Sequence, residues 1–390
     1  MKDYTLLQRK YLVNTYVNRG LTIVEGEGVY LRDASGEPYL DLMTNYGVNI
    51  FGHGHPVLTA RLINQVRKLT TLHGSFANDQ RAEAAQKLVG RCGGGLSQVF
   101  FSNSGAEANE AALKFAVLAT GKKKFVACRN GYHGKTLGAL SATDGRKFRE
   151  AFEPLLWNFT VIDYNNLSAL ETALSDETAA FIVEPVQGEG GILLPDAGYL
   201  GHAGELCRSR RALLILDEVQ TGTGRTGYFL ASHPEGLFYD IVTLGKGLGG
   251  GIPIGATIVS QNIAERIPRS SHTSTFGGNP LAAAGILGAL EILDEALLAH
   301  VREIGGYFLE NLLKIRSDLI VQVRGRGLML GLEVKARRDE ILKELQKEKI
   351  LAIPAGDNVV RFLPPYIIEK DHLDWALEKI GGVFSALSPS

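Results

Sequence analysis

The chain has 390 residues, of which 45% are hydrophobic and 21% are charged, so it can bury a large core and is expected to form one big α/β domain plus a smaller unit. Its 41 basic and 42 acidic residues give a net charge of -1, which excludes the basic surface typical of proteins that bind nucleic acid or anionic membranes. Three cysteines without a Cys-x-x-Cys pair, no signal peptide and no long apolar run favour a cytoplasmic protein that acts on small molecules, with no membrane, disulfide or metal expected.

The N-terminal part has the pattern of a β-hairpin. Two short strand-like runs, 29–33 and 38–42, flank turn-forming residues at 34–37. A hairpin of this size is not stable alone, so we expect it to pack with the C-terminal part of the chain.

From about residue 90, short apolar runs alternate with helical segments. This alternation predicts crossover units and a mainly parallel sheet. Seven strands are expected, at 98–101, 124–128, 159–162, 180–183, 213–216, 241–244 and 256–259.

After about residue 285 the pattern predicts a smaller α+β unit. Helices are expected at 285–298, 301–315, 338–348 and from Asp371, and strands at 327–334 and 359–363. The predicted class is therefore α/β, with a large domain over 46–284 and a discontinuous small domain formed by 1–45 and 285–390.

Polar residues follow four of the expected strands directly. In open α/β sheets, ligands bind outside the carboxyl ends of the strands. The four clusters begin at Ser102, Glu184, Asp217 and Gly245, and the last of them contains Lys246. We expect them to build one site.

Lys246 and Asp217 indicate the chemistry of that site. Lys246 follows an apolar strand and stands among glycines, as expected of an amine held toward a bound group, so it is a candidate Schiff-base lysine. Asp217 ends a wholly apolar strand, where a carboxylate requires a cationic partner. The protonated pyridine nitrogen of pyridoxal phosphate (PLP) would serve; the alternative is an aspartate that caps the next turn.

A helix is expected to begin after Ser104. Ser104 and Glu107 have the spacing of a capping box, and Gly121 is the expected stop. Gly105 and Ala106 would leave backbone N–H groups uncovered, which suits a phosphate. The alternative is an ordinary capped helix.

Three further motifs do not fit their surroundings. The run GTGRTG at 222–227 matches the dinucleotide-binding pattern, but a segment broken by Pro234 follows it where a helix is required, so we predict a loop. Residues 134–136 resemble part of a phosphate-binding loop whose first glycine is replaced by Arg129. The pair of histidines at 53–55 is more typical of a turn than of a metal site.

Five motifs resemble the class III (subgroup II) PLP-dependent aminotransferases in order and spacing: SNSGAEA at 102–108, EPVQGEGG at 184–191, LDEVQTG at 216–222, GKGLGGG at 245–251 and STFGGNP at 274–280. The resemblance extends from Asp41 to about Pro365. It implies the type I fold of PLP-dependent transferases, PLP as the cofactor, and an obligate homodimer with sites at the subunit interface.

The resemblance also implies roles around the cofactor ring. Lys246 would bind PLP covalently and then move the proton, and Asp217 would pair with the pyridine nitrogen. Gln220 would contact the phenolic oxygen. Tyr132 would stack on the ring, where a phenylalanine is more usual, and His133 is the one histidine expected nearby.

The phosphate site is implied in the same way. Backbone N–H groups of Gly105 and Ala106, at the helix start marked by Ser104, would bind the phosphate. Thr275 of the partner subunit would complete the site.

The run NVVRFLPP at 358–365 resembles the acetylornithine and ornithine aminotransferases, in which the arginine at the position of Arg361 holds the substrate α-carboxylate. Glu189 would pair with Arg361 when the substrate α-amino group must be spared, and Glu184 is counted with these substrate-binding residues. Without such a pair, Arg361 would be a surface residue of a strand.

Lys135 stands where those enzymes have an arginine for the distal carboxylate, and lysine offers a point charge instead of a fork. Its surroundings, 132–143, look more like putrescine aminotransferase, and Tyr46 lies near a pocket tyrosine of ornithine aminotransferase. The expected reaction moves the terminal amino group of N-acetylornithine, or an ornithine-like amine, to 2-oxoglutarate. A putrescine aminotransferase is the alternative.

Three other functions stay open. A glutamate-semialdehyde aminomutase would use similar cofactor chemistry without an added keto acid. A nicotinamide-dependent oxidoreductase would use the glycines at 222–227, and a catalytically silent scaffold would bind PLP or a sugar without needing Lys246.

Overall fold

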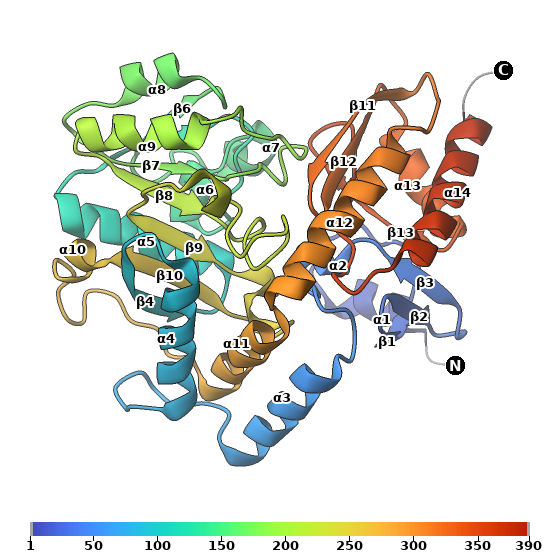
Figure 1. The fold of residues 1–390 in the computed structure, drawn as a ribbon, viewed down its shortest axis with the longest axis horizontal. Helices are drawn as coiled ribbons and strands as arrows, with labels where there is room; N and C mark the ends of the chain where they lie inside the picture. The colour runs from blue at the N-terminus through green and yellow to red at the C-terminus, as the bar shows by residue number, and fades with distance from the viewer. Residues whose placement is uncertain (1–2, 388–390) are drawn as a thin grey trace.

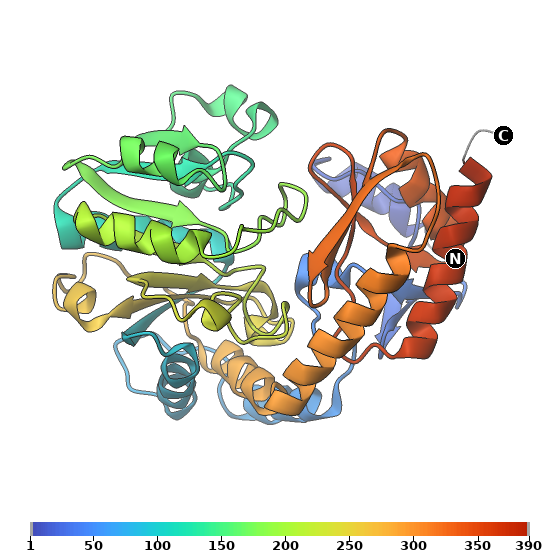
Figure 2. The same ribbon diagram turned by 45° about the horizontal axis from the view of Figure 1, so that its top comes forward.

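The computed structural model describes residues 3–387. The chain forms one seven-stranded sheet and two four-stranded sheets. The large sheet lies in one half of the molecule, and the two small sheets lie in the other half together with the long helix α12 (Glu295–Leu312), as Figures 1 and 2 show. The predicted α/β class with a larger and a smaller unit is confirmed.

The large sheet has the strand order β4-β10-β9-β8-β7-β5-β6. Only β10 runs antiparallel to its neighbours, so the sheet is mainly parallel, as predicted. Its strands, which start and end within two residues of the predicted runs, are β4 (Leu96–Ser102), β5 (Lys124–Cys128), β6 (Asn158–Ile162), β7 (Thr178–Val183), β8 (Leu213–Asp217), β9 (Ile241–Leu244) and β10 (Gly255–Ser260).

Helices cover both faces of this sheet. Along β8, Ile215 packs into the apolar cluster of helix α5 (Gly105–Thr120), whereas Leu214 and Leu216 pack on the other face with helix α9 (Tyr199–Ser209). Strand β7 is buried at every position. Two covered faces explain why these strands read as continuous apolar runs.

The N-terminal hairpin forms as predicted and joins a C-terminal strand. β2 (Tyr30–Asp33) pairs antiparallel with β3 (Pro38–Asp41), and β3 pairs in parallel with β13 (Ile350–Leu351). β1 (Ile23–Glu27) completes this sheet at its other edge. Residues from both ends of the chain therefore share one sheet, and the boundaries at 46 and 285 stay predictions.

The last sheet is antiparallel, with the order β11-β12-β15-β14. The predicted strand at 327 begins instead at Met329, because Gly327 adopts a positive φ of 57° in the turn after a strand that the sequence pattern missed. The four strands are β11 (Ile320–Arg326), β12 (Met329–Val334), β15 (Val359–Phe362) and β14 (Ile353–Ala355).

The helices predicted at 285–298 and 301–315 are wrong in their limits. Helix α11 (Pro280–Ile292) begins earlier because Asn279 accepts a hydrogen bond from the Ala282 backbone N–H. Helix α12 begins at Glu295 because Asp294 caps it in the same way. Both caps were readable in the sequence.

The remaining helices complete the chain, and none within residues 3–387 combines the length and apolar character needed to cross a bilayer. The α-helices are α1 (Tyr4–Tyr11), α2 (Thr44–Gly47), α3 (Pro56–Lys68), α4 (Asp79–Cys92), α6 (Leu137–Ala142), α7 (Arg146–Arg149), α8 (Leu167–Ala173), α10 (Gln261–Ala264), α13 (Arg338–Lys347) and α14 (Lys370–Leu387). The 3-10 helices are η1 (Glu150–Phe152), η2 (His233–Glu235) and η3 (Lys246–Gly249).

Candidate active site

The polar residues predicted at the strand ends lie along one rim of the large sheet. Asp217 is the last residue of β8, and it is paired in register with Thr243 of β9, three residues before Lys246. Glu184 follows β7 directly. Because these strands are parallel neighbours, their carboxyl ends bring the three side chains to the same edge.

Asp217 is the centre of a buried hydrogen-bond network. Its Oδ2 accepts a hydrogen bond from Asn109 Nδ2 at 2.7 Å and lies 2.7 Å from His133 Nδ1, while Oδ1 accepts from the Val219 backbone N–H at 3.1 Å. Burial alone would lower the pKa of His133, but the hydrogen bond and charge of Asp217 outweigh it, and the pKa is raised. The network fixes the orientation of the carboxylate.

Asn109 is a site residue that sequence reasoning missed. It also donates to the His133 carbonyl at 2.7 Å, and its Oδ1 accepts a hydrogen bond from Thr243 Oγ1 at 2.7 Å. The available signal was a polar residue interrupting the otherwise apolar buried face of α5.

Lys246 lies where burial favours its uncharged amine. Burial lowers its pKa, and the negative charges of Asp217 and Glu184 only partly oppose this. Its Nζ has no hydrogen-bond partner within residues 3–387, and its φ of 46° is unusual for a residue other than glycine. A partly buried, unpaired amine of lowered pKa is suited to nucleophilic attack on a carbonyl group.

Two glycines allow the Lys246 segment to approach the start of α5. A Cβ on Gly105 would lie 2.4 Å from Val219 Cγ1, and one on Gly245 would lie 3.2 Å from the Gly105 Cα. A larger residue at 105 would collide with Val219, and one at 245 would crowd the start of α5.

The start of α5 offers free backbone donors. Ser104 Oγ accepts from the Glu107 backbone N–H at 3.2 Å, as predicted, but the Glu107 carboxylate returns the bond to Asn103, one residue earlier than in a capping box. In the described chain the N–H groups of Gly105 and Ala106 have no acceptor. Such an uncovered helix start binds phosphate readily.

These features fit PLP. They supply an unpaired amine, a fixed carboxylate one strand away, and uncovered N–H groups beside the amine. His133 Nε2 is also buried without a partner, which leaves one further donor or acceptor in this network.

Arg361 is fully buried, so a surface role is wrong. Its Nη2 lies 2.9 Å from Glu189 Oε2, and its Nη1 donates to Gln220 Oε1 at 3.1 Å. The guanidinium also lies 5.6 Å from the centre of the Tyr46 ring. The predicted Arg361–Glu189 pair is therefore present, and Gln220 is hydrogen-bonded to Arg361.

Two predicted residues lie apart from this cluster. Lys135 is exposed and its Nζ lies 5.5 Å from the Phe148 ring, which contacts Tyr132 edge to face at 5.6 Å. Thr275 is exposed in the loop before α11. Neither side chain is joined to Arg361 or Asp217 by a hydrogen bond in the described chain.

Glu184 is buried beside the amine. Its carboxylate accepts from the backbone N–H groups of Tyr132 at 2.8 Å and Gly188 at 3.1 Å. Burial raises its pKa to about 7, the charge of Asp217 adds to the rise, and His133 opposes it.

Glu184 should make the stability of the cofactor-free protein depend on pH. The neutral carboxyl favours the folded state, so its contribution is complete below pH 4.5 and is lost as the pH rises through about 7. Relative to Glu184→Gln, we expect wild type to lose on the order of 3 kcal/mol of unfolding free energy over this interval. Urea unfolding of both proteins at pH 5 and pH 8 measures the difference, and equal pH slopes would contradict it.

The structure explains two of the motifs that did not fit their surroundings, the histidines at 53–55 and the run at 222–227. His53 Nε2 lies 2.9 Å from Asp41 Oδ2, and within residues 3–387 no group of three or more His, Cys, Asp or Glu side chains is placed to hold a metal ion. Residues 222–227 form a loop, as predicted.

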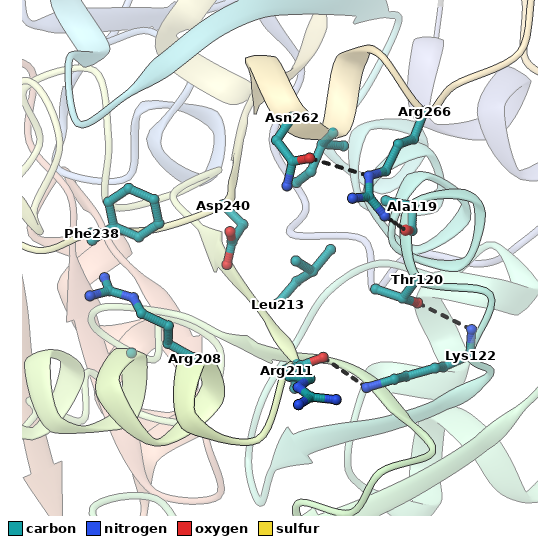
Figure 3. Close-up of a pocket in the computed structure, with 13 residues that line it drawn as sticks. Ala119, Thr120, Lys122, Arg208, Arg211, Leu213, Phe238, Asp240, Asn262 and Arg266 are labelled. Atoms are coloured by element: carbon teal, nitrogen blue, oxygen red, sulfur yellow. Dashed lines mark hydrogen bonds between the residues drawn. The ribbon is translucent and has the colours of Figure 1, made fainter.

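A cavity of about 440 Å³ lies at the opposite end of the sheet, where β8 begins (Figure 3). Two of the cationic side chains that line it bind the chain's own carbonyl groups: Lys122 Nζ donates to the Arg211 carbonyl at 2.7 Å, and Arg266 Nη1 donates to the Ala119 carbonyl at 3.1 Å. The cavity is separate from the rim that carries Lys246.

Comparison with known proteins agrees with this geometry. The family model described as aminotransferase class-III matches residues 11–384. The acetylornithine aminotransferase of Methanopyrus kandleri is 43% identical over 380 residues, which are 97% of each chain. The LysW-aminoadipate semialdehyde transaminase of Deinococcus radiodurans is 40% identical, covering 98% of this chain and 90% of that protein.

Solved structures point the same way. The ornithine aminotransferase of Toxoplasma gondii superimposes with a TM-score of 0.95 and 35% identity, covering 99% of this chain and 95% of that one. A second structure of that enzyme, with a TM-score of 0.93, 35% identity and coverage of 99% and 94%, is described as having partial occupancy of PLP at its active site.

Proposed function

The chain belongs to the class-III aminotransferases, whose cofactor is PLP, and we propose that it moves the terminal amino group of N-acetylornithine, or of an ornithine-like amine, to 2-oxoglutarate. The products are a semialdehyde and glutamate. The observation that carries this choice is the ion pair between the buried Arg361 and the partly exposed Glu189. Both residues act on the pKa of Lys246, Arg361 lowering it and Glu189 raising it, so the pair faces the same site as the amine.

PLP supplies a ring that withdraws electrons from the carbon bearing the amino group. Lys246 Nζ would be the base that takes a proton from that carbon and returns it. Asp217, held by Asn109 and His133, would hold the ring nitrogen and keep it protonated. Gly105 and Ala106 would bind the phosphate.

Arg361 and Glu189 would let one pocket serve two substrates. With the pair closed at 2.9 Å, the guanidinium is neutralised and the pocket presents the terminal amine of the donor. When Glu189 releases it, the Arg361 fork binds the α-carboxylate of 2-oxoglutarate with two parallel hydrogen bonds.

A putrescine aminotransferase is the second candidate, and Lys135 favours it. Lys135 lies over the Phe148 ring and forms no salt bridge with a carboxylate among the residues that the structure describes, and a single ammonium group binds a distal carboxylate less specifically than an arginine fork. A diamine needs no such contact.

A homodimer is part of the proposal, and exposed apolar side chains support it. Phe76 and Phe276 are 63% and 57% exposed, and the two loops are linked by Arg81, which donates to the carbonyls of Phe76 and Gly278. Large apolar patches are rare on monomers. Because Thr275 is adjacent to Phe276, it would complete the phosphate site of the partner subunit.

Steady-state rates with three donors test the proposed substrate. With 2-oxoglutarate as acceptor, kcat/KM should be at least about ten-fold higher for N-acetylornithine or ornithine than for putrescine. A reaction that needs no added keto acid would favour the aminomutase, and reduction of a nicotinamide cofactor would favour the oxidoreductase. Absence of turnover with both amino acids would contradict the proposal.

A further inference from the structure

The glycine-rich loop at 222–227 packs closely between the larger unit, to which it belongs, and the C-terminal part of the chain. A Cβ on Gly224 would lie 2.8 Å from Leu293 Cδ1, and one on Gly227 would lie 2.2 Å from Arg302 Cγ. Both glycines have positive φ, at 91° and 86°. The glycines of this motif, which resembles a dinucleotide fingerprint, therefore let the loop pack closely against Leu293 and Arg302. The same loop places Arg225 in the interior.

Arg225 is 1% exposed and joins three segments that are far apart in sequence. Its Nη1 donates to the carbonyls of Leu328 at 2.9 Å and Pro364 at 2.6 Å, and its Nη2 donates to Thr44 Oγ1 at 3.4 Å. The guanidinium lies 4.8 Å from the centre of the Tyr366 ring.

No carboxylate in the described chain forms a salt bridge with Arg225. Burial lowers its pKa, and Tyr366 and Asp41 oppose the change. Burying a cation without a paired anion destabilises the folded state, so packing alone does not explain why an arginine occupies this position.

Two of the three segments that Arg225 joins lie next to Arg361 and Tyr46, the residues proposed to bind the substrate. Pro364 follows β15, the strand that carries Arg361, by two residues. Thr44 begins a run of three residues with positive φ, 43° at Thr44, 50° at Asn45 and 60° at Tyr46. Non-glycine residues rarely adopt this conformation, and such strain persists only where the surroundings enforce it.

Thr44 connects the two segments directly. Its Oγ1 donates to the Leu363 carbonyl at 2.7 Å and accepts from Arg225, so one hydroxyl joins the strained run, the end of β15 and the guanidinium. The Tyr46 ring then faces Arg361 at 5.6 Å. Arg225 touches neither residue, but it holds the backbone from which each projects.

We propose that Arg225 is a positioning residue for carboxylate recognition, which fixes Arg361 and Tyr46 face to face so that the Arg361 fork is aligned for the substrate carboxylate. The inference rests on the proposed function, because it assumes that Arg361 binds a carboxylate. No hydrogen bond or salt bridge joins Arg225 to Lys246 or Asp217 within residues 3–387, so its loss should spare the amine and carboxylate that are proposed to hold PLP.

Glutarate, an unreactive dicarboxylate with the carbon skeleton of 2-oxoglutarate, is a suitable probe. Calorimetric titration of the PLP-loaded protein should give a Kd about ten-fold to a hundred-fold higher for Arg225→Met than for wild type. Arg225→Lys should lie between them, because a single ammonium nitrogen keeps the charge but cannot occupy the positions of both Nη1, which binds the two carbonyls, and Nη2, which binds Thr44. The visible absorbance of bound PLP should not change.

Arg302→Met is the matched control, since Arg302 holds the same loop through the Gly227 carbonyl without reaching Leu328, Pro364 or Thr44. Its glutarate Kd should equal that of wild type. Thr44→Val removes the shared hydroxyl, tests the same link if Arg225→Met does not fold, and should also weaken glutarate binding.

A merely structural role predicts another pattern: Arg225→Met and Arg302→Met would lower the melting temperature together and leave the glutarate Kd within about two-fold of wild type. That result would overturn the positioning role alone. Wild-type protein that binds PLP but not glutarate would instead overturn the proposed carboxylate substrate and, with it, this inference.

Discussion

Replacing Lys246 with alanine is expected to lower kcat/KM for amino-group transfer by at least about 1,000-fold, because it removes both the nucleophile and the proton carrier. The amine has no hydrogen-bond partner in the described chain, so its removal breaks no internal hydrogen bond. Burial lowers its pKa, which a nucleophilic role requires and a structural ion pair does not. The fold should therefore survive the change.

The control for this variant is Lys124→Ala. Lys124 also borders a strand of the large sheet, but its side chain is half-exposed and pairs with Glu177 at the surface. Rates should be unchanged in Lys124→Ala, and both variants should give the wild-type circular dichroism spectrum. Near-normal activity of Lys246→Ala would support the silent scaffold instead.

Asp217→Asn is expected to lower kcat by about 100-fold to 10,000-fold while keeping PLP bound. Asparagine has nearly the same shape, but it removes the charge that favours a protonated ring nitrogen. It also removes the negative charge that helps to raise the pKa of His133, so this pKa should fall in the variant. NMR titration of the His133 ring in both proteins would measure this second effect.

Asp240→Asn is the matched control. Asp240 precedes β9 at the opposite end of the sheet and accepts a hydrogen bond from the Leu214 backbone N–H. Its loss can reduce stability but should leave kcat unchanged. If Asp217→Asn and Asp240→Asn lowered kcat equally, the assignment of Asp217 to the cofactor ring would be wrong.

Much of the large sheet could be predicted because its strands are buried on both faces. Continuous apolar runs such as 180–183 and 213–216 have few alternatives in a chain of this size. Strand β11 was missed because its residues are only partly buried and alternate with charged side chains. The limits of α11 and α12 were misplaced because periodicity was weighed above the capping residues Asn279 and Asp294.

The rim of the site was predictable for a topological reason, since parallel strands place their carboxyl ends together. Asp217, Glu184 and Lys246 therefore met as expected. Asn109 was not predicted, because its partners His133 and Asp217 are 24 and 108 residues away in sequence. Arg225 and Thr44 were missed for the same reason: a buried cation that binds carbonyls has no local pattern.

For Lys135, the sequence motif predicts where the residue lies in the chain but not where its side chain points. The sequence places it two residues after His133, but the structure turns its ammonium group over Phe148 and toward solvent. Its role in binding a distal carboxylate stays a prediction.

Borohydride reduction of the PLP-loaded protein, followed by peptide mapping, tests the central claim most directly. Reduction makes the covalent attachment of the cofactor permanent, and we expect one pyridoxyl label, on the peptide that contains Lys246. A label on any other lysine, or no label on a protein that has bound PLP and transfers amino groups, would contradict the account.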